Sequence, residues 1–402
     1  MYKRQVLPGF NEDLGLFKQA PSSEVTFPGT SLAQFVGMAP ERIYDTRKGV
    51  GGRSTRIGPG ETVQVQIAGV AGIPASDVGA VSINITSINP TGSTWIAAFP
   101  TGFPLPNSST LNPRANTIVP NMSVVGVGTD GSISLYNDSA EVHVTVDVMG
   151  YFRAAGTSRM MPLSPSRILD TRKGVGAPKA RVRGEDTLAL QVLGEGGVPN
   201  SGVDSVVLNV ASINPTQNGW VTAWPSDESS KPLVANLSYR AGAVVPNLVV
   251  CKVGSDGKIN LETSAGQLDL VADVVGCFTS TGSQLAPVAP TRLLDTRDGT
   301  GAPQARVGAG EEITLQVTGE GGVPSQATAV ALNVTAVRPT EQTFLTTYPN
   351  GESLPTASSL NPDAGKVSAN LVIAKLGDGG RVKIYNERGD VDLLADLTAY
   401  FV

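Results

Sequence analysis

Apolar and polar residues alternate with a period of two over most of the chain. The run VHVTVDVMGYF (142–152) is typical, because Val142, Val144 and Val146 fall on one face and polar residues on the other. Little of the sequence has the 3.6-residue period of a helix. Turn signals such as Asn89-Pro90 and Asp130-Gly131 separate the runs. This pattern predicts an all-β chain of many short antiparallel strands.

The alternating runs recur in three copies. VSINITSINPTGSTWIAAFP in the first copy corresponds to VVLNVASINPTQNGWVTAWP in the second and VALNVTAVRPTEQTFLTTYP in the third. A repeat of this length exceeds the ~20–50 residues of a solenoid repeat and has the size of a small domain. The copies predict three domains, joined by short linkers rich in Pro, Gly and Ser, at residues 42–153, 167–278 and 292–402.

Each copy is expected to fold as an antiparallel β-sandwich of seven or eight strands, jelly-roll-like in topology. In the first copy the strands are expected at the Asp-Thr-Arg segment and then near 62–68, 80–88, 94–99, 122–128, 132–136 and 142–152. Three covalently joined copies could also pack around a pseudo-threefold axis, as a single-chain imitation of a homotrimer.

Residues 1–41 belong to none of the three copies. They are extended in character, and Pro8, Pro21 and Pro28 oppose regular structure. Two interpretations remain open for this N-terminal arm: a disordered segment, or a strap that docks on a partner.

Composition narrows the functional classes. A formal charge of −5 and a pI near 5.1 argue against nucleic acid as a partner, because phosphate binding needs Lys and Arg concentrated on one face. No run reaches the ~18 apolar residues of a membrane span, and the first residues lack the ~7–15 apolar residues of a secretory signal. The two cysteines, Cys251 and Cys277, are interpreted as buried free thiols, although a disulfide between them stays open.

Each copy opens with the motif Arg-x-x-Asp-Thr-Arg-x-Gly-x-Gly and closes on a strand that carries an aspartate at the same position in all three copies, Asp147, Asp273 or Asp396. The face of the closing strand that holds this aspartate is partly apolar, so its carboxylate needs a partner. We expect Asp147 to pair with Arg42 or Arg47 and so to fasten the first strand to the last, and likewise in the other copies. The residues of these structural ion pairs are Arg42, Asp45, Arg47, Asp147, Arg167, Asp170, Arg172, Asp273, Arg292, Asp295, Arg297 and Asp396.

Catalytic interpretations of the motif are weaker. A glycosidase would need a second carboxylate ~5–9 Å away, for which the closing-strand aspartates are candidates. The single histidine, His143, argues against Ser-His-Asp and Cys-His catalysis and against a zinc site. The turns TDGS, SDGK and GDGG are too short for a calcium loop, and GEGGVP lacks phosphate-loop spacing. No catalytic residue, metal or cofactor is therefore expected.

An aromatic row in each copy is the best binding candidate. Aromatic, small and aromatic residues alternate on one strand face, which suits either the core of the sandwich, the favoured interpretation, or a flat platform on which sugar rings stack. Exposure of the rings decides between the two. The residues of this candidate ligand-binding platform are Trp95, Phe99, Trp220, Trp224, Phe344 and Tyr348.

The N-glycosylation sequons Asn84-Ile85-Thr86 and Asn333-Val334-Thr335 occupy related positions in the first and third copies. Both lie inside strand-like runs at matching places in their copies. We interpret these asparagines as hydrogen-bonding scaffold positions and not as glycan acceptors.

The repeat resembles a family found in many secreted actinobacterial proteins and in some structural proteins of phages that infect those bacteria. The resemblance rests on the opening motif (Arg167 to Gly176), Leu-Asn-Val-Thr (Leu332 to Thr335), an Asn-Pro-Thr turn (Asn89 to Thr91) and the closing Asp-Val-x-Gly-Tyr-Phe (Asp147 to Phe152). The chain departs from the pattern at Cys277, Ala399 and Arg338, which replace Tyr, Gly and Asn. The family implies a surface-displayed, non-enzymatic module and brings no catalytic residue or ligand with it.

Within that family, the absence of an export signal favours a virion protein over a secreted one. We therefore expect an actinophage virion component, either a tail-tip, fibre-like or capsid decoration protein, that binds other virion proteins through residues 1–41. Its three domains would contact a host-envelope glycan with avidity. A homo-oligomer is a further option. The alternatives are a bacterial surface adhesin or carbohydrate-binding module and, third, a glycan-cleaving enzyme.

Overall fold

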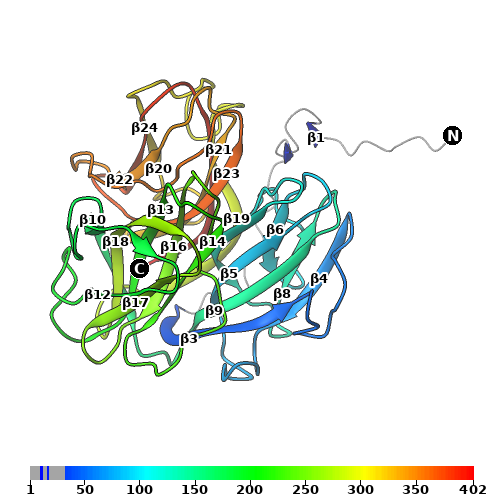
Figure 1. Cartoon of the computed structure of the whole chain (residues 1–402). Coiled ribbons are helices and arrows are strands. Elements are labelled where there is room, and N and C mark those ends of the chain that lie inside the picture. Colours follow the sequence, from blue (N-terminus) through cyan, green and yellow to red (C-terminus); the bar gives the residue numbers. More distant parts are fainter. Residues whose placement is uncertain (1–9, 12–15, 18–31) are drawn as a thin grey trace.

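The computed structural model describes residues 10–11, 16–17 and 32–402, and every regular element in these ranges is a β-strand (Figure 1). Strands β1 (Phe10–Asn11) and β2 (Leu16–Phe17) pair antiparallel with each other. The rest of the described chain folds into three domains of two sheets each.

The first domain contains a four-stranded sheet in the order β3-β9-β5-β7 and a three-stranded sheet in the order β4-β8-β6. All neighbouring strands in them run antiparallel. The strands span β3 (Gln34–Asp45), β4 (Glu61–Gln66), β5 (Ala80–Ile88), β6 (Ile96–Pro100), β7 (Ile118–Gly126), β8 (Ser132–Asn137) and β9 (His143–Arg153).

The second domain has the sheet orders β10-β18-β13-β16, with β11 also paired to β18, and β12-β17-β14-β15. When the two-residue β11 is left out and the other eight strands of this domain are numbered 1 to 8 in chain order, strands 1, 8, 3 and 6 form one sheet. Strands 2, 7, 4 and 5 form the other, which is the jelly-roll order. The strands span β10 (Arg159–Asp170), β11 (Val182–Arg183), β12 (Thr187–Gln191), β13 (Val203–Ile213), β14 (Gly219–Pro225), β15 (Leu237–Tyr239), β16 (Val244–Lys252), β17 (Lys258–Thr263) and β18 (Gln267–Thr279).

The third domain repeats the first, with sheets β19-β25-β21-β23 and β20-β24-β22. In both of these domains an isolated bridge, Ile96 with Leu111 or Leu345 with Leu360, stands where the second domain has β15. All three domains are therefore jelly-roll sandwiches. The strands span β19 (Leu285–Asp295), β20 (Glu312–Gln316), β21 (Ala329–Val337), β22 (Leu345–Pro349), β23 (Val367–Lys375), β24 (Arg381–Asn386) and β25 (Asp392–Phe401).

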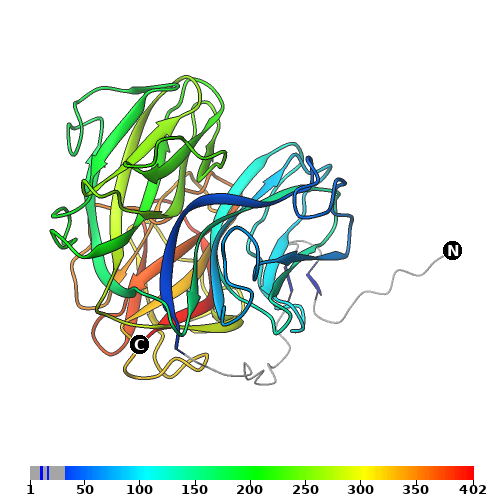
Figure 2. The same cartoon turned by 90° about the horizontal axis from the view of Figure 1, so that it is seen from below.

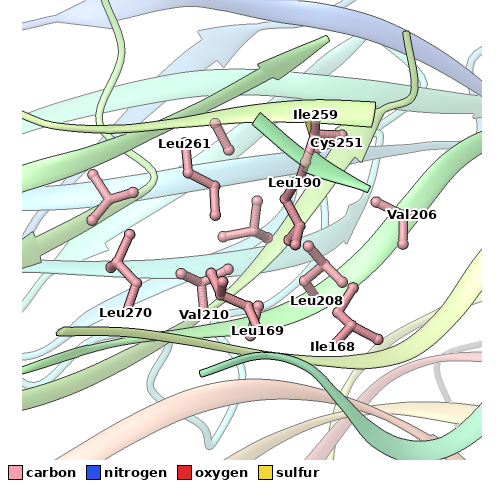
Figure 3. Packing of buried hydrophobic residues seen from close by; sticks show 14 of the residues in the cluster. Ile168, Leu169, Leu190, Val206, Leu208, Val210, Cys251, Ile259, Leu261 and Leu270 are labelled. Carbon is pink, nitrogen blue, oxygen red and sulfur yellow. The ribbon is translucent and has the colours of Figure 1, made fainter. Parts of the chain in front are cut away.

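Each sandwich encloses its own apolar core. Figure 3 shows this core in the second domain, where Leu190, Ile259 and Leu261 from one sheet face Leu208 and Val210 from the other. Alternation along each strand supplies these side chains, because every second residue points between the sheets.

A fourth core is shared by all three domains, which cluster around a common centre (Figures 1 and 2). Phe152, Phe278 and Phe401, at equivalent closing-strand positions, all belong to it. The sheets that hold the first and last strand of each domain are thus covered on both faces, and all nine residues of β5 are buried. The chain forms a pseudo-threefold body, as the sequence suggested.

The first strands begin earlier than the sequence analysis placed them. β3 starts at Gln34, β10 at Arg159 and β19 at Leu285, so residues 34–41 of the expected arm, and the second halves of the expected linkers, are strand. Each strand shifts register at a shared proline, Pro40, Pro165 or Pro290, which has no N–H to donate. The interpretation of 154–166 and 279–291 as plain linkers was wrong in this part.

These early strand segments bind the three domains together. Ala33 and Leu285 exchange two backbone hydrogen bonds of 2.8 Å each, and Phe35 pairs likewise with Ser158. Met160 and Ser283 form the third such pair of backbone hydrogen bonds, between the second and third domains. Every pair of domains is therefore joined by one short backbone bridge.

The remaining residues of the predicted N-terminal arm lie outside the described residues, apart from β1, β2 and residues 32–33.

Candidate functional site

The repeated motif forms a tight turn at the end of each first strand. The Asp45 carboxylate accepts the backbone N–H of Arg47 at 2.9 Å, while the Asp45 N–H donates to Val50 O at 3.1 Å. Gly176, the last motif residue in the second copy, has φ +67°, and a Cβ there would lie 2.1 Å from Ile168 O. The motif glycine is thus required by the turn geometry.

The expected ion pair joins the first strand to the last in every domain. Arg42 Nε donates to Asp147 Oδ1 at 2.7 Å and Arg42 Nη2 to Asp147 Oδ2 at 2.9 Å, a two-pronged contact. The same contact joins Arg167 to Asp273, at 2.8 and 3.0 Å, and Arg292 to Asp396, at 2.5 and 3.2 Å.

The second arginine of each motif binds the motif aspartate. Arg47 donates from Nε and Nη2 to Asp45 at 3.0 and 2.8 Å, and Arg172 and Arg297 do the same with Asp170 and Asp295. Sequence reasoning left open which arginine would reach Asp147. The structure assigns Arg42 to it and keeps Arg47 within the turn.

Burial sets the electrostatics of these carboxylates. Burial raises the pKa of Asp147, against the pull of hydrogen bonds from Arg42, and the same holds for Asp273 with Arg167. The hydrogen bond from Arg172 lowers the pKa of Asp170. Asp45 and Asp147 are both fully buried. A glycan could therefore not reach either carboxylate in this structure.

The lone histidine occupies a structural position. His143 Nδ1 lies 2.9 Å from Thr46 Oγ1, and in the other copies Asp269 and Asp392 accept the equivalent threonine hydroxyl at 2.9 and 3.1 Å. Burial, followed by the charges of Arg56 and Arg47, lowers the pKa of His143. His143 thus replaces an aspartate of the repeat as the partner of the motif threonine.

Asn84 and Asn333, the asparagines of the two sequons discussed above, belong to a network of buried asparagines between domains. Asn247 Nδ2 donates to Asn84 Oδ1 at 2.9 Å, Asn370 Nδ2 to Asn209 Oδ1 at 3.1 Å, and Asn121 Nδ2 to Asn333 Oδ1 at 2.8 Å. The second domain thus bonds the first, the third bonds the second, and the first bonds the third. This cyclic order makes the threefold relation explicit.

A loop of each domain also contacts the neighbouring domain, beside the buried asparagine and the ion pair of that domain. Ala235 O accepts Asn84 Nδ2 at 2.7 Å, and the Ala235 backbone also hydrogen-bonds the Asp147 carboxylate. Ser358 stands in the same relation to Asn209 and Asp273. The ion pairs therefore fasten strands within a domain and also take part in the contact between domains.

The sugar platform, the less favoured of the two interpretations of the aromatic row, is wrong for most of its rings. Trp95, Phe99, Trp224 and Tyr348 are at most 4% exposed, so their faces cannot stack on a sugar. Phe344 is only partly exposed. The residues that cover these rings come from neighbouring strands and loops, as when Tyr136 of β8 packs on Trp95 with centroids 5.0 Å apart. Trp220, 46% exposed, is the exception.

The two cysteines are buried free thiols. Cys251 on β16 and Cys277 on β18 flank the same residue, Val206 of β13, from opposite sides. Their Cα atoms are thus separated by two strand spacings, about 9–10 Å, whereas a disulfide needs less than about 7 Å. The thiol interpretation is correct, and burial raises the pKa of Cys277 to about 11.

In residues 10–11, 16–17 and 32–402 no three or more His, Cys, Asp and Glu side chains gather in a way that could hold a metal ion. Across the same part of the chain no helix is long and apolar enough to cross a membrane.

Comparison with known proteins gives little beyond this geometry. No protein-family model matches the chain, and no curated protein does. Among solved structures, a chain of Sulfolobus Turreted Icosahedral Virus is 10% identical, with 92% of this chain and 91% of that chain covered and a TM-score of 0.19. A chain from the triple jelly roll and turret assembly of an archaeal virus is 9% identical, with 90% and 94% covered and a TM-score of 0.17. TM-scores of this size do not establish a common arrangement.

Proposed function

We propose that the chain is a non-enzymatic structural protein of an actinobacteriophage virion, namely a tail-tip, fibre-like or capsid decoration protein. The observation that carries the proposal is the fused trimer itself: three jelly rolls share one core, three backbone bridges and a cyclic set of asparagine bonds. Such a body holds three similar outer faces in fixed relation. Linked similar faces multiply weak contacts with a repetitive surface.

The state of the charged residues supports a non-enzymatic role. Each closing-strand aspartate is held by two hydrogen bonds from an arginine, and Asp147 and Asp273 also contact the neighbouring domain. A catalytic carboxylate must meet a substrate, whereas these are buried. The motif is thus fully used by folding and domain assembly.

The N-terminal part is proposed as the anchor to the particle. The structure shortens the candidate segment, because residues 34–41 belong to β3 and cannot be removed without damaging the first sandwich. Residues 1–31 therefore form the segment to test. Other virion proteins would be its partners.

The decisive experiment compares the full chain with a deletion of residues 1–31 for binding to purified particles. We expect the full chain to sediment with particles through a density gradient and the deletion to remain soluble and folded but unbound. Thermal unfolding of the deletion provides the folding control. Equal sedimentation of both would remove the anchoring role, and sedimentation of neither would contradict the virion proposal.

A bacterial surface adhesin is the second candidate, because jelly rolls serve as lectin domains as well as capsid domains. The exposed Trp220 favours this candidate, because its ring offers one stacking surface. An adhesin would bind isolated cell-wall polysaccharide with or without residues 1–31. This result, together with no particle binding, would support the adhesin.

A further inference from the structure

Trp220 is exposed because of one difference between the copies. In the first and third domains the corresponding rings, Trp95 and Phe344, pair with a tyrosine on the neighbouring strand, Tyr136 or Tyr385. The second domain has Glu262 at that tyrosine position. Glu262 forms a salt bridge with Lys231 and accepts Thr187 Oγ1 at 3.2 Å, so it is drawn to these groups and leaves the indole uncovered.

A shallow, open pocket of about 590 Å³ lies beside this tryptophan. Its lining includes Arg183, Glu185, Thr216, Gln217, Ser264 and Gln267. Ser264 joins the two features, because its Oγ accepts the backbone N–H of Trp220 at 2.9 Å and its own backbone N–H donates to the backbone O of Trp220 at 2.9 Å. The pocket thus adjoins the strand residue that carries the exposed indole.

The pocket side chains are also specific to the second domain. Arg183 and Glu185 align with Gly58 and Gly60 in the first copy and with Gly308 and Gly310 in the third. Glu185 has φ +69°, in the left-handed region that its counterparts fill with glycine. A side chain held at such a position is unfavourable for folding, and strained residues of this kind cluster at ligand sites.

The surroundings favour an uncharged ligand. The lining contributes one arginine and one glutamate, and the nearby Glu262 is balanced by Lys231. No excess of positive charge marks the pocket as a phosphate site. Hydroxyl, amide and charged side chains beside one exposed aromatic ring are the groups that recognise a pyranose: the ring stacks on the C–H face and the polar groups bond the hydroxyls.

We propose that the second domain binds a neutral pyranose oligosaccharide, with one sugar ring stacked on Trp220 and the next in the pocket lined by Glu185, Gln217 and Ser264. The second domain is the location of the site, because a tyrosine packs on the equivalent ring in the first and third domains and glycines replace Arg183 and Glu185 there. This proposal rests on the proposed function only for the biological source of the sugar, which would be a host envelope. The binding itself stands on the residues above.

The test is titration of the full chain with hexasaccharides of glucose, mannose, galactose and N-acetylglucosamine. Binding is measured by tryptophan fluorescence and by isothermal titration calorimetry. Trp95 and Trp224 are buried, so the fluorescence change on binding should come from Trp220. We expect at least one hexasaccharide to bind and W220A to weaken binding at least tenfold, whereas W220F should retain part of it.

Two variants separate binding from folding. E185G removes a pocket side chain at a position that prefers glycine, so we expect equal or higher thermal stability together with weaker binding. E262Y restores the tyrosine of the other copies, so Trp220 should become covered and binding should be lost although the tryptophan remains. L233A, at a side chain 87% exposed in the same domain, is the matched control and should bind like the parent.

The outcomes are distinct. The proposal would be overturned if none of the four hexasaccharides bound at concentrations up to about 10 mM, which is high enough to detect weak sugar binding. Undiminished binding by W220A and E262Y would also overturn it. Binding only to anionic polysaccharide, abolished by salt, would overturn the neutral class of ligand. W220A should sediment with particles like the parent, so a failed sugar site and a failed virion role are told apart.

Discussion

Asn247 of the second domain donates its side-chain amide to Asn84 Oδ1 of the first domain at 2.9 Å, although 163 residues separate them. The same Asn247 accepts the backbone N–H of Met122, also in the first domain, at 3.2 Å. One amide thus satisfies a buried donor and a buried acceptor across the domain boundary. The equivalent residues Asn370 and Asn121 do so at the other two boundaries.

Replacement of Asn247 by alanine should destabilise the whole body. It leaves Asn84 Oδ1 and the Met122 N–H without these partners, and each unsatisfied buried group costs roughly 1–3 kcal/mol. Denaturant unfolding should show a loss of this order for N247A. The exposed Asn200 provides the control, since N200A should change stability by less than about 0.5 kcal/mol. Equal stability of the two variants would contradict the network's role.

The buried ion pairs should show strong coupling between their partners. Arg292 is 5% exposed at its side chain and Asp396 2%, so R292M leaves a buried carboxylate without its arginine and should cost about 3–5 kcal/mol. The double variant R292M/D396L removes both charges and should recover most of the loss. Denaturant unfolding of the parent, both single variants and the double variant measures the coupling, and simple additivity of the two losses would argue against it.

The shared core should make the three domains unfold together. Phe35, Phe278 and Phe401 belong to one cluster, so loss of any domain exposes apolar surface of the other two. Calorimetry should therefore show one transition, and N247A should lower its midpoint as a whole. Separate transitions, with only one of them moved by N247A, would mean that the domains are independent in folding.

Much of this arrangement was accessible from the sequence for a physical reason. The period-two alternation of the closing strand placed Asp147 on a covered face, and a covered carboxylate requires a cation, so the pairing with the opening motif could be predicted. The shared Pro40, Pro165 and Pro290 were also visible, and they indicate that the repeat begins before Arg42.

Other features depend on register and on contacts between distant segments. Trp95 is covered and Trp220 is exposed because the side chain diagonally placed on the neighbouring strand differs, Tyr136 in one case and Glu262 in the other. A single strand read alone therefore predicted the same platform for both. The contact of Ala235 with Asn84 likewise depends on domain packing, which no local pattern encodes.

The thiols should be unreactive in the native protein. Cys251 and Cys277 are almost fully buried, and burial raises the pKa of Cys277 to about 11, so little thiolate forms at pH 8. We expect no reaction with Ellman's reagent in buffer and release of two equivalents in denaturant, without reductant. Fewer than two equivalents in denaturant would indicate a disulfide and contradict the strand geometry.

The contribution of Arg172 to stability should depend on pH with a definite sign. Arg172 lowers the pKa of Asp170 below its ordinary value of 3.8, so the stabilisation is complete above the unfolded-state pKa of about 3.9 and is lost as the pH falls through the lower folded-state pKa. Because the Arg172 side chain is 41% exposed, R172Q should cost only about 0.5–1 kcal/mol at pH 7. The difference between R172Q and the parent should stay constant from pH 7 to about pH 4.5 and shrink towards zero below pH 3. K173Q removes an exposed charge from the same turn and should show no such loss, and a difference for R172Q that grows at low pH would contradict the assignment.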